Sequence, residues 1–363
     1  MNPAPISARV FRPLALGLLL LLLTAAPPLW AGPPRRYALE SQERPVALLS
    51  AGRTTYLITE HSIYQRQGRQ FVRRYQSPAL IRCALATDTL LWLGTQEGLR
   101  QLPTATWQAQ PLPAAETAAQ APITTLVQDA AGTIWVGAAG YGVFQLQHGH
   151  LLSQLSIPTI NAGLVTADSS VWLATNLGLH RWQHQRWTRY NEEGVANHEI
   201  PDNIVEKLLP DNRGNVWVVM SSGISVFARP GAAEAGEEHL PTVRFIGRPG
   251  NDIYSVTYVP GQGHVFATAM GLLLLPAQPS GELAGLEPAT TTDKIETPQL
   301  LHALTLAGAA TAPGLLQMDA HRHLWVVQAG EVSEWSTKAF RKATQPEGNA
   351  SFRRPVTAGL SAQ

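Results

Sequence analysis

Residues 123–136 read ITTLVQDAAGTIWV, residues 208–218 read LLPDNRGNVWV and residues 315–326 read LLQMDAHRHLWV. In each stretch a polar turn separates two apolar runs, and an aspartate precedes a tryptophan by six residues: Asp129 and Trp135, Asp211 and Trp217, Asp319 and Trp325. Units that recur in this way are typical of repeat architectures, in which each unit buries its apolar face against the next. This recurrence decides the fold.

The same aromatic position recurs along most of the chain. Two copies have a shorter turn, with Trp92 and Trp172 four residues after an aspartate, and two weaker copies place Tyr56 and Phe266 there. The seven positions (56, 92, 135, 172, 217, 266 and 325) are 36 to 59 residues apart, close to the length of a four-stranded propeller blade. We therefore predict an all-β fold, a β-propeller of seven four-stranded blades. Its strands are named a to d from the centre outward.

Each residue type in the repeat has a physical role. The aspartate is expected to accept backbone N–H bonds within the a–b turn. The aromatic ring is expected to pack against the neighbouring blade, since burying a tryptophan contributes about 4–6 kcal/mol gross. The one cysteine, Cys83, excludes an intramolecular disulfide, so packing must hold the ring. We expect this thiol to be buried in an inner strand.

Composition and the N-terminus suggest an exported globular protein. Hydrophobic residues make up 45% and charged residues 15% of the chain, and the net charge is +1, which argues against disorder and against nucleic acid as a partner. Arg9 and Arg12 precede an apolar run over residues 14–26, which predicts a signal peptide over residues 1–31, with an uncleaved anchor as the alternative. We expect a periplasmic or secreted protein with no other membrane span.

The propeller is predicted to span residues 37–345, and residues 346–363 form a tail or a ring-closing strand. A strand from one terminus usually closes a propeller because closure removes an open sheet edge. Residues 352–360 (FRRPVTAGL) look like the start of another repeat, and residues 37–39 are a competing candidate. The sequence leaves both open.

Four segments carry a resemblance to a known family: residues 86–102 (ATDTLLWLGTQEGLRQL), 127–146 (VQDAAGTIWVGAAGYGVFQL), 166–182 (TADSSVWLATNLGLHRW) and 209–227 (LPDNRGNVWVVMSSGISVF). They resemble the two-component regulator propeller repeat, whose members are typically extracytoplasmic sensory regions of bacterial hybrid sensor kinases. The resemblance implies a sensor propeller. Residues after 345 resemble neither a second propeller, a kinase nor a DNA-binding helix, so we expect either a complete protein or a shortened relative that works with a separate sensor kinase.

Candidate binding residues gather on the expected face of d–a connections and b–c turns. Long loops on a rigid scaffold often carry function, and a long loop is expected on this face over residues 190–203. The candidates on this face are Glu97, Tyr141, Asn176, Glu193, Asn197 and His198. The same b–c turns also contain Glu60, His61, Gln96 and Ser222.

Other clusters have plainer interpretations. The pairs His148 with His150 and His321 with His323 could ligate a metal, but neither has a third ligand nearby in sequence, so we expect turn residues. An arginine cluster on the c–d hairpin of the first blade is expected to be a solvated edge, with contact to an anionic polymer as the alternative: Arg66, Arg69, Arg73 and Arg74. Trp182, Trp187 and Tyr190 are expected to pack between blades.

The sequence contains no catalytic motif of the kinds that mark hydrolases, metalloproteases or phosphate-binding loops. We therefore expect a non-enzymatic protein without cofactor or metal that binds a glycan fragment or a protein partner. Two alternatives remain. One is a scaffold component of the cell envelope. The other is a lyase resembling streptogramin lyase, also a seven-bladed propeller, which would need a histidine and a carboxylate meeting on one face near a metal.

Overall fold

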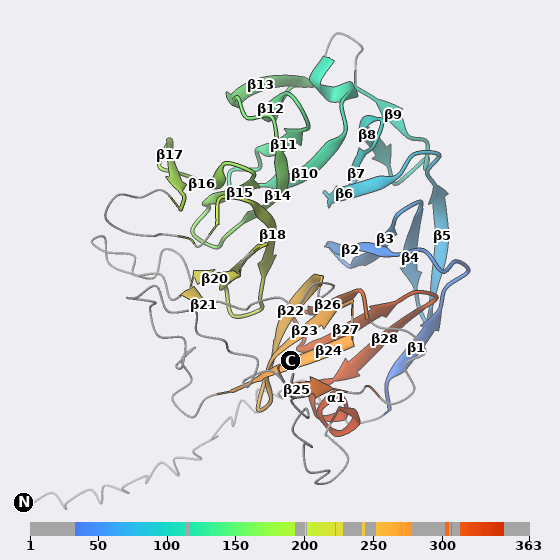
Figure 1. The fold of residues 1–363 in the computed structure, drawn as a ribbon. Helices are drawn as coiled ribbons and strands as arrows, with labels where there is room; N and C mark the ends of the chain where they lie inside the picture. Colours follow the sequence, from blue (N-terminus) through green and yellow to red (C-terminus); the bar gives the residue numbers. More distant parts are fainter. Residues whose placement is uncertain are drawn as a thin grey trace, which may run out of the picture.

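Seven four-stranded antiparallel sheets form a closed ring, which confirms the predicted seven-bladed propeller (Figure 1). The computed structural model describes residues 33–112, 117–192, 200, 202–221, 223–227, 242–243, 252–269, 271–277, 302–304, 306 and 313–344. The innermost strands of neighbouring blades contact one another around the central channel.

The blades follow one another in chain order. Blade 1 contains β2 (Pro45–Ala51), β3 (Thr54–Thr59), β4 (Ser62–Gln67) and β5 (Gln70–Gln76); blade 2 contains β6 (Ile81–Ala86), β7 (Leu90–Thr95), β8 (Gly98–Pro103) and β9 (Gln110–Pro111). The short 3-10 helix η1 (Thr117–Gln120) leads to blade 3, which contains β10 (Ile123–Gln128), β11 (Ile134–Ala138), β12 (Gly142–Gln147) and β13 (His150–Leu155). Blade 4 contains β14 (Ile160–Val165), β15 (Val171–Thr175), β16 (Gly178–Gln183) and β17 (Arg186–Tyr190).

The second half of the ring follows the same plan. Blade 5 contains β18 (Val205–Pro210), β19 (Val216–Met220), β20 (Ile224–Phe227) and β21 (Thr242–Val243); blade 6 contains β22 (Ile253–Val259), β23 (Gly263–Thr268), β24 (Gly271–Pro276) and β25 (His302–Leu304). Blade 7 contains β26 (Leu315–Met318), β27 (His323–Gln328), β28 (Glu331–Ser336) and the N-terminal strand β1 (Arg35–Ala38), and the helix α1 (Thr337–Ala343) follows β28.

The repeated aromatic residues all lie on the second strand of a blade and pack between blades. Trp135, Trp172 and Trp217 are fully buried. Trp135 contacts Trp182 and Trp187 of the next blade, with ring centroids 5.7 and 6.0 Å away, and Trp217 contacts Phe266 of blade 6 at 5.1 Å. Interblade packing of the aromatic residues is therefore confirmed, and these contacts supply the core that a disulfide-free ring requires.

The recurring six-residue spacing of aspartate and tryptophan has a cause that the sequence did not reveal. Asp129 Oδ1 accepts the N–H groups of Ala131 and Thr133 at 3.0 and 2.9 Å, as predicted, while Oδ2 accepts the indole Nε1–H of Trp135 at 2.9 Å. In the same way, the indole N–H of Trp217 donates to Asp211 at 3.0 Å and that of Trp325 donates to Asp319 at 3.2 Å. In the shorter turn of blade 4, the indole of Trp172 donates instead to Thr166, which also lies six residues earlier.

The ring is closed by the N-terminal strand. β1 pairs with β28 in the outer position of blade 7, so residues 37–39 include part of the closing strand, while the tail 346–363 lies outside the described residues. Tyr37 stacks on Trp325 at 6.0 Å and donates its hydroxyl hydrogen to buried Glu334 at 2.8 Å. The hydrogen bonds and packing of this strand thus join the start of the chain to its last described blade.

Arg66 belongs to this closure rather than to a fully solvated edge. Its guanidinium donates to Glu334 and Tyr37 at 3.1 and 3.0 Å and lies 5.0 Å from the Trp325 ring centre. The expectation of a solvated hairpin is therefore wrong for Arg66, because the closing strand places a buried carboxylate beside it. Arg69 is exposed, as expected.

The predicted signal peptide, residues 1–31, lies outside the described residues. In the described part of the chain, every helix is too short or too polar to cross a membrane.

Candidate binding site at the channel mouth

Six of the inner strands carry an extra residue close to the point where the strand begins. In each, the pairing with the second strand skips one position: Val46, Arg82, Thr124, Asn161, Glu206 and Tyr254. Such β-bulges leave the extra residue outside the ladder and re-aim its side chain. All six lie at the end of the channel that the d–a connections and b–c turns share, which we call the mouth.

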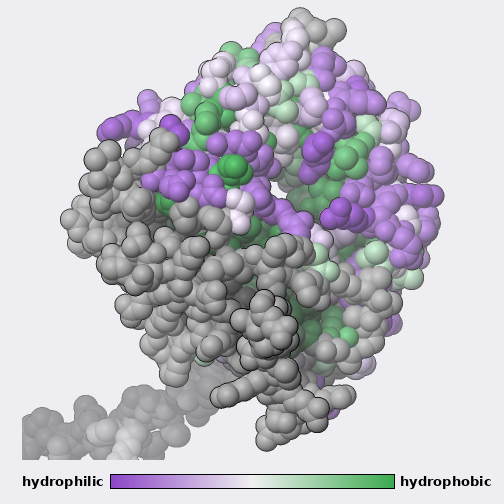
Figure 2. Space-filling view, viewed as in Figure 1, coloured by the Kyte–Doolittle hydropathy of each residue, from purple (hydrophilic) through white to green (hydrophobic). Residues whose placement is uncertain are grey.

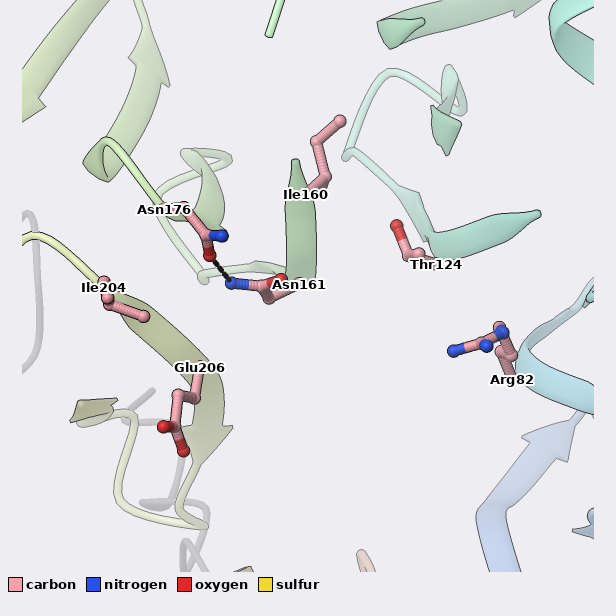
Figure 3. Close-up of a pocket in the computed structure, with 7 residues that line it drawn as sticks. All are labelled: Arg82, Thr124, Ile160, Asn161, Asn176, Ile204 and Glu206. Atoms are coloured by element: carbon pink, nitrogen blue, oxygen red, sulfur yellow. Dashed lines mark hydrogen bonds between the residues drawn. The ribbon is translucent and has the colours of Figure 1, made fainter. Parts of the chain in front are cut away.

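Four of these bulge residues line one cavity. It has a volume of about 420 Å³ and is bounded by residues of blades 2 to 5: Arg82, Thr124, Ile160, Asn161, Asn176, Ile204 and Glu206 (Figure 3). Cavities of this size are typical of small-molecule sites. We call these seven residues the channel-mouth site.

Amide side chains from the b–c turns orient two of the bulge residues. Gln96 Oε1 accepts the Nε–H of Arg82 at 2.6 Å, which leaves the terminal guanidinium nitrogens directed at the cavity. Asn161 Nδ2 donates to Asn176 Oδ1 at 2.9 Å and to the Val205 carbonyl at 2.7 Å. Because both N–H groups of Asn161 are used, this pair presents the Asn161 oxygen as an acceptor and the Asn176 nitrogen as a donor.

The two charged residues of the site lie on opposite sides of the cavity. Figure 3 shows Arg82 entering from blade 2 and Glu206 from blade 5. Both are exposed, and among the described residues neither has an ion-pair partner. The mouth therefore offers an unpaired cation and an unpaired anion to a ligand.

Exposed apolar side chains lie on the same face as the polar cavity. Three of the four large hydrophobic residues that are exposed in the described chain lie at the mouth, on blades 3, 4 and 5: Tyr141 (47%), Leu177 (47%) and Ile204 (46%). Figure 2 shows an opening in the middle of the ring, with hydrophilic residues on its border and hydrophobic ones close by. Exposed apolar groups with polar neighbours are typical of interaction surfaces.

A second, smaller cavity lies at the mouth beside blades 1, 6 and 7. Its volume is about 180 Å³, and its lining includes Arg44 and Tyr254. The Arg44 guanidinium lies 5.7 Å from the centre of the Tyr254 ring, and the Lys207 ammonium lies 5.4 Å from the same ring. Cationic groups thus border the channel on this side as well.

The structure describes three of the six predicted binding residues. Glu97 and Tyr141 are exposed in b–c turns at the mouth, and Asn176 lines the cavity. Glu193, Asn197 and His198 lie outside the described residues. Whether these residues bind a ligand stays a prediction.

Sequence reasoning missed the bulge residues, although a signal existed. In five blades the bulge residue directly follows a β-branched apolar residue at the start of the inner strand: Ile81-Arg82, Ile123-Thr124, Ile160-Asn161, Val205-Glu206 and Ile253-Tyr254. The second residue differs in chemistry from blade to blade, as expected of positions that face a ligand rather than a core.

The two histidine pairs that the sequence raised as possible metal ligands lie in or beside turns away from the mouth. His323 lies 3.1 Å from Glu334 and 3.5 Å from Asp319, so the fold supplies neighbours that the sequence did not show. The carboxylates already accept hydrogen bonds, Glu334 from Arg66 and Tyr37 and Asp319 from Trp325. This cluster is therefore explained by ring closure. His148 lies in the β12–β13 turn, at the opposite end of the blade from the mouth.

Two other titratable groups, Asp211 and Cys83, have pKa values shifted by their structural surroundings. Burial opposes ionisation of Asp211, but hydrogen bonds from His264, Trp217 and Asn215 outweigh it and hold its pKa below the ordinary value. Burial raises the pKa of the Cys83 thiol to about 12, so this cysteine is an inert part of inner strand β6.

Known structures share this fold. No protein-family model matches the sequence, and no curated protein matches it. One similar structure is the extracellular domain of BT4673 from B. thetaiotaomicron, which is assigned to the hybrid two-component systems (TM-score 0.57, 16% identity, 83% of this chain and 39% of that one). This chain thus spans about two-fifths of that domain.

Two other similar structures have different roles. One is a streptogramin B lyase (TM-score 0.57, 12% identity, 83% of this chain and 96% of that one). The other is YCF48 bound to D1 peptide (TM-score 0.56, 11% identity, 84% and 95%). At these identities the likeness shows the fold alone, and the propeller supports sensing, catalysis and peptide binding in different proteins.

Proposed function

We propose that this protein is an extracytoplasmic recognition propeller that binds a glycan fragment or a polypeptide at the channel-mouth site. One observation carries the proposal: bulges in four consecutive blades direct Arg82, Thr124, Asn161 and Glu206 into one cavity. A bulge interrupts ladder hydrogen bonds, and its recurrence at one position of the blade is consistent with a shared functional purpose.

The chemistry of the cavity favours binding over catalysis. Its one hydroxyl, Thr124, donates to the Gly137 carbonyl at 3.4 Å, and no described lining residue activates it as a nucleophile. The His264–Asp211 contact, 3.0 Å long, lies at the a–b turn end of blade 5, opposite the mouth. A site made of oriented donors, acceptors and fixed charges suits recognition.

The proposed setting is outside the cytoplasm, with the signal passed to a partner such as a separate sensor kinase. The apolar run near the N-terminus and the repeat pattern support export. The likeness to an extracellular sensor domain is consistent with that setting.

A thermal-shift screen tests the proposal. The purified protein is heated with neutral oligosaccharides (maltotriose, xylotriose), an acidic one (trigalacturonate) and pooled tripeptides, and hits are quantified by calorimetry. We expect at least one class to raise the unfolding temperature. The shift should be readily measured, because a ligand at 100 times its Kd stabilises the fold by about 2.7 kcal/mol.

Variants locate the binding. Arg82→Ala and Asn161→Ala should weaken a hit at least tenfold, while Arg69→Ala, an exposed arginine on the opposite face, should not. Binding that is insensitive to both mouth variants would place the site elsewhere, and a lack of binding by every class would leave a scaffold role.

A further inference from the structure

We infer that the ligand of the channel-mouth site is a short peptide with free termini, whose carboxylate binds Arg82 and whose amino group binds Glu206. The inference rests on the proposed function and names its ligand class. Its basis is the arrangement of charge, hydrogen-bonding groups and apolar surface around one cavity.

The charges come first. Arg82 and Glu206 face the cavity from opposite sides, and neither is neutralised by another described residue. A neutral ligand that covered them could replace water with hydrogen bonds but would bring no opposite charge to either group, which is less favourable than an ion pair with each. A purely anionic ligand would be attracted by Arg82 but repelled by Glu206. A purely cationic ligand would be attracted by Glu206 but repelled by Arg82. A ligand with separated opposite charges satisfies both.

Arg82 is prepared for a carboxylate. Its Nε–H is held by Gln96 at 2.6 Å, so the side chain is fixed through one edge while its terminal nitrogens face the cavity. A guanidinium fork binds a carboxylate through two parallel hydrogen bonds. An arginine that is already oriented loses less conformational freedom when it binds.

The paired asparagines match a peptide bond. Asn161 presents an acceptor oxygen and Asn176 a donor nitrogen, held together by their 2.9 Å hydrogen bond. A peptide unit offers one N–H and one C=O, so the two side chains can satisfy both groups of one peptide bond. The exposed apolar residue Ile204, which also lines the cavity, provides contact for an aliphatic side chain.

Calorimetry with capped peptides tests this assignment on the full-length protein. The probes are tripeptides Ala-Xaa-Ala with every residue type at Xaa, each with free termini, with an acetylated N-terminus and with an amidated C-terminus. We expect free peptides with aliphatic Xaa to bind best. Each cap should weaken binding about tenfold or more, because it removes one charge.

Two matched variants assign each charge to its residue. In Arg82→Gln the amide cap should cost nothing further, while the acetyl cap should keep its effect; in Glu206→Gln the reverse should hold. When a cap and a substitution together cost no more than the substitution alone, the capped group and the substituted side chain are in direct contact. Arg69→Gln serves as the control and should retain both cap effects.

The outcomes separate this inference from the proposed function. If an oligosaccharide binds at the mouth in an Arg82-dependent manner and no tripeptide does, the peptide assignment is wrong and the recognition site stands. If capped and free peptides bind equally, the charge assignment is overturned. If no oligosaccharide or peptide binds, the proposed function fails as well.

Discussion

At the scale of single residues, one aspartate per repeat links turn geometry to core packing. Asp129 uses one oxygen for the turn and the other for the indole of Trp135, so the hairpin and the interblade ring are fixed by the same carboxylate. The spacing of six residues follows from this contact. The sequence showed the spacing and predicted the turn role, but the bond to the indole required the positions of both carboxylate oxygens.

Asp129→Ala should therefore lower the free energy of unfolding by about 2–3 kcal/mol, since it leaves a buried indole N–H and two turn N–H groups without their acceptor. Urea denaturation followed by tryptophan fluorescence measures the change. Asp88→Ala is the matched control: Asp88 lies exposed in the a–b turn of blade 2, so its loss should change stability by less than about 0.5 kcal/mol. Equal effects would contradict the dual role.

A second residue-scale prediction concerns acid. Burial, reinforced by the positive charge of Arg189, lowers the pKa of His180 to about 4, whereas an unfolded histidine titrates near 6.5. Between these values the unfolded chain binds more protons than the folded one, so the free energy of unfolding falls as pH decreases. The full effect of this one group is about 3 kcal/mol.

His180→Leu should remove this part of the acid sensitivity. Urea midpoints measured from pH 7 to pH 4.5 should then fall less steeply than those of the unmodified protein. His321→Leu, at an exposed turn position, should leave the original slope. If the slope is the same in all three proteins, His180 is not the acid-sensitive group.

At the scale of elements, the strands were predictable and their register was not. Alternating apolar residues, and a glycine after the second strand in six of the seven repeats, indicate four short strands per repeat. Periodicity did not predict the bulge at Arg82 or Asn161. A bulge adds one residue to the strand and moves every following side chain to the other face, so it breaks the alternation on which a periodicity argument depends. For that reason the candidate site contained the b–c turn residue Asn176 but missed its partner, Asn161.

The outer strand β1 gives the sharpest element-scale prediction. Glu334 on β28 is 2% exposed and accepts from Tyr37 of β1 and from Arg66 of blade 1. Glu334→Ala should cost about 3–5 kcal/mol, since it strands a partly buried arginine and breaks the closure. Glu331→Ala, on the same strand but in an exposed pair with Arg36, should cost at most about 1 kcal/mol.

Hydrogen exchange distinguishes a local effect from a general one. In Glu334→Ala the amides of β1 and β28 should exchange faster than those of blades 3 and 4, since the ring opens where its two ends meet. Uniform acceleration in all blades would contradict a closure role for Glu334.

At the scale of the whole molecule, the described part of the ring begins and ends on the face opposite the binding site. β1 runs from Arg35 to Ala38 toward the mouth, and β28 runs away from it into α1. Residue 35 and the helix α1 therefore lie on the face opposite the channel-mouth site. Seven blades followed from the repeat, but the closing strand could not be chosen from sequence because both termini contain short strand-like segments.

This polarity can be tested with the cysteine chemistry of the molecule. Burial raises the pKa of the Cys83 thiol to about 12, so we expect maleimide reagents to leave it unmodified in the folded protein. A cysteine introduced by Ala130→Cys, in an a–b turn, or by Glu97→Cys, in a b–c turn, is exposed and can be biotinylated selectively. Immobilised on streptavidin through position 130, the protein should bind its mouth ligand normally. Attachment through position 97 should block a large conjugate in which the tripeptide is joined to maltose-binding protein through the side chain of its central residue, so that both termini stay free. The opposite pattern would place the site on the other face.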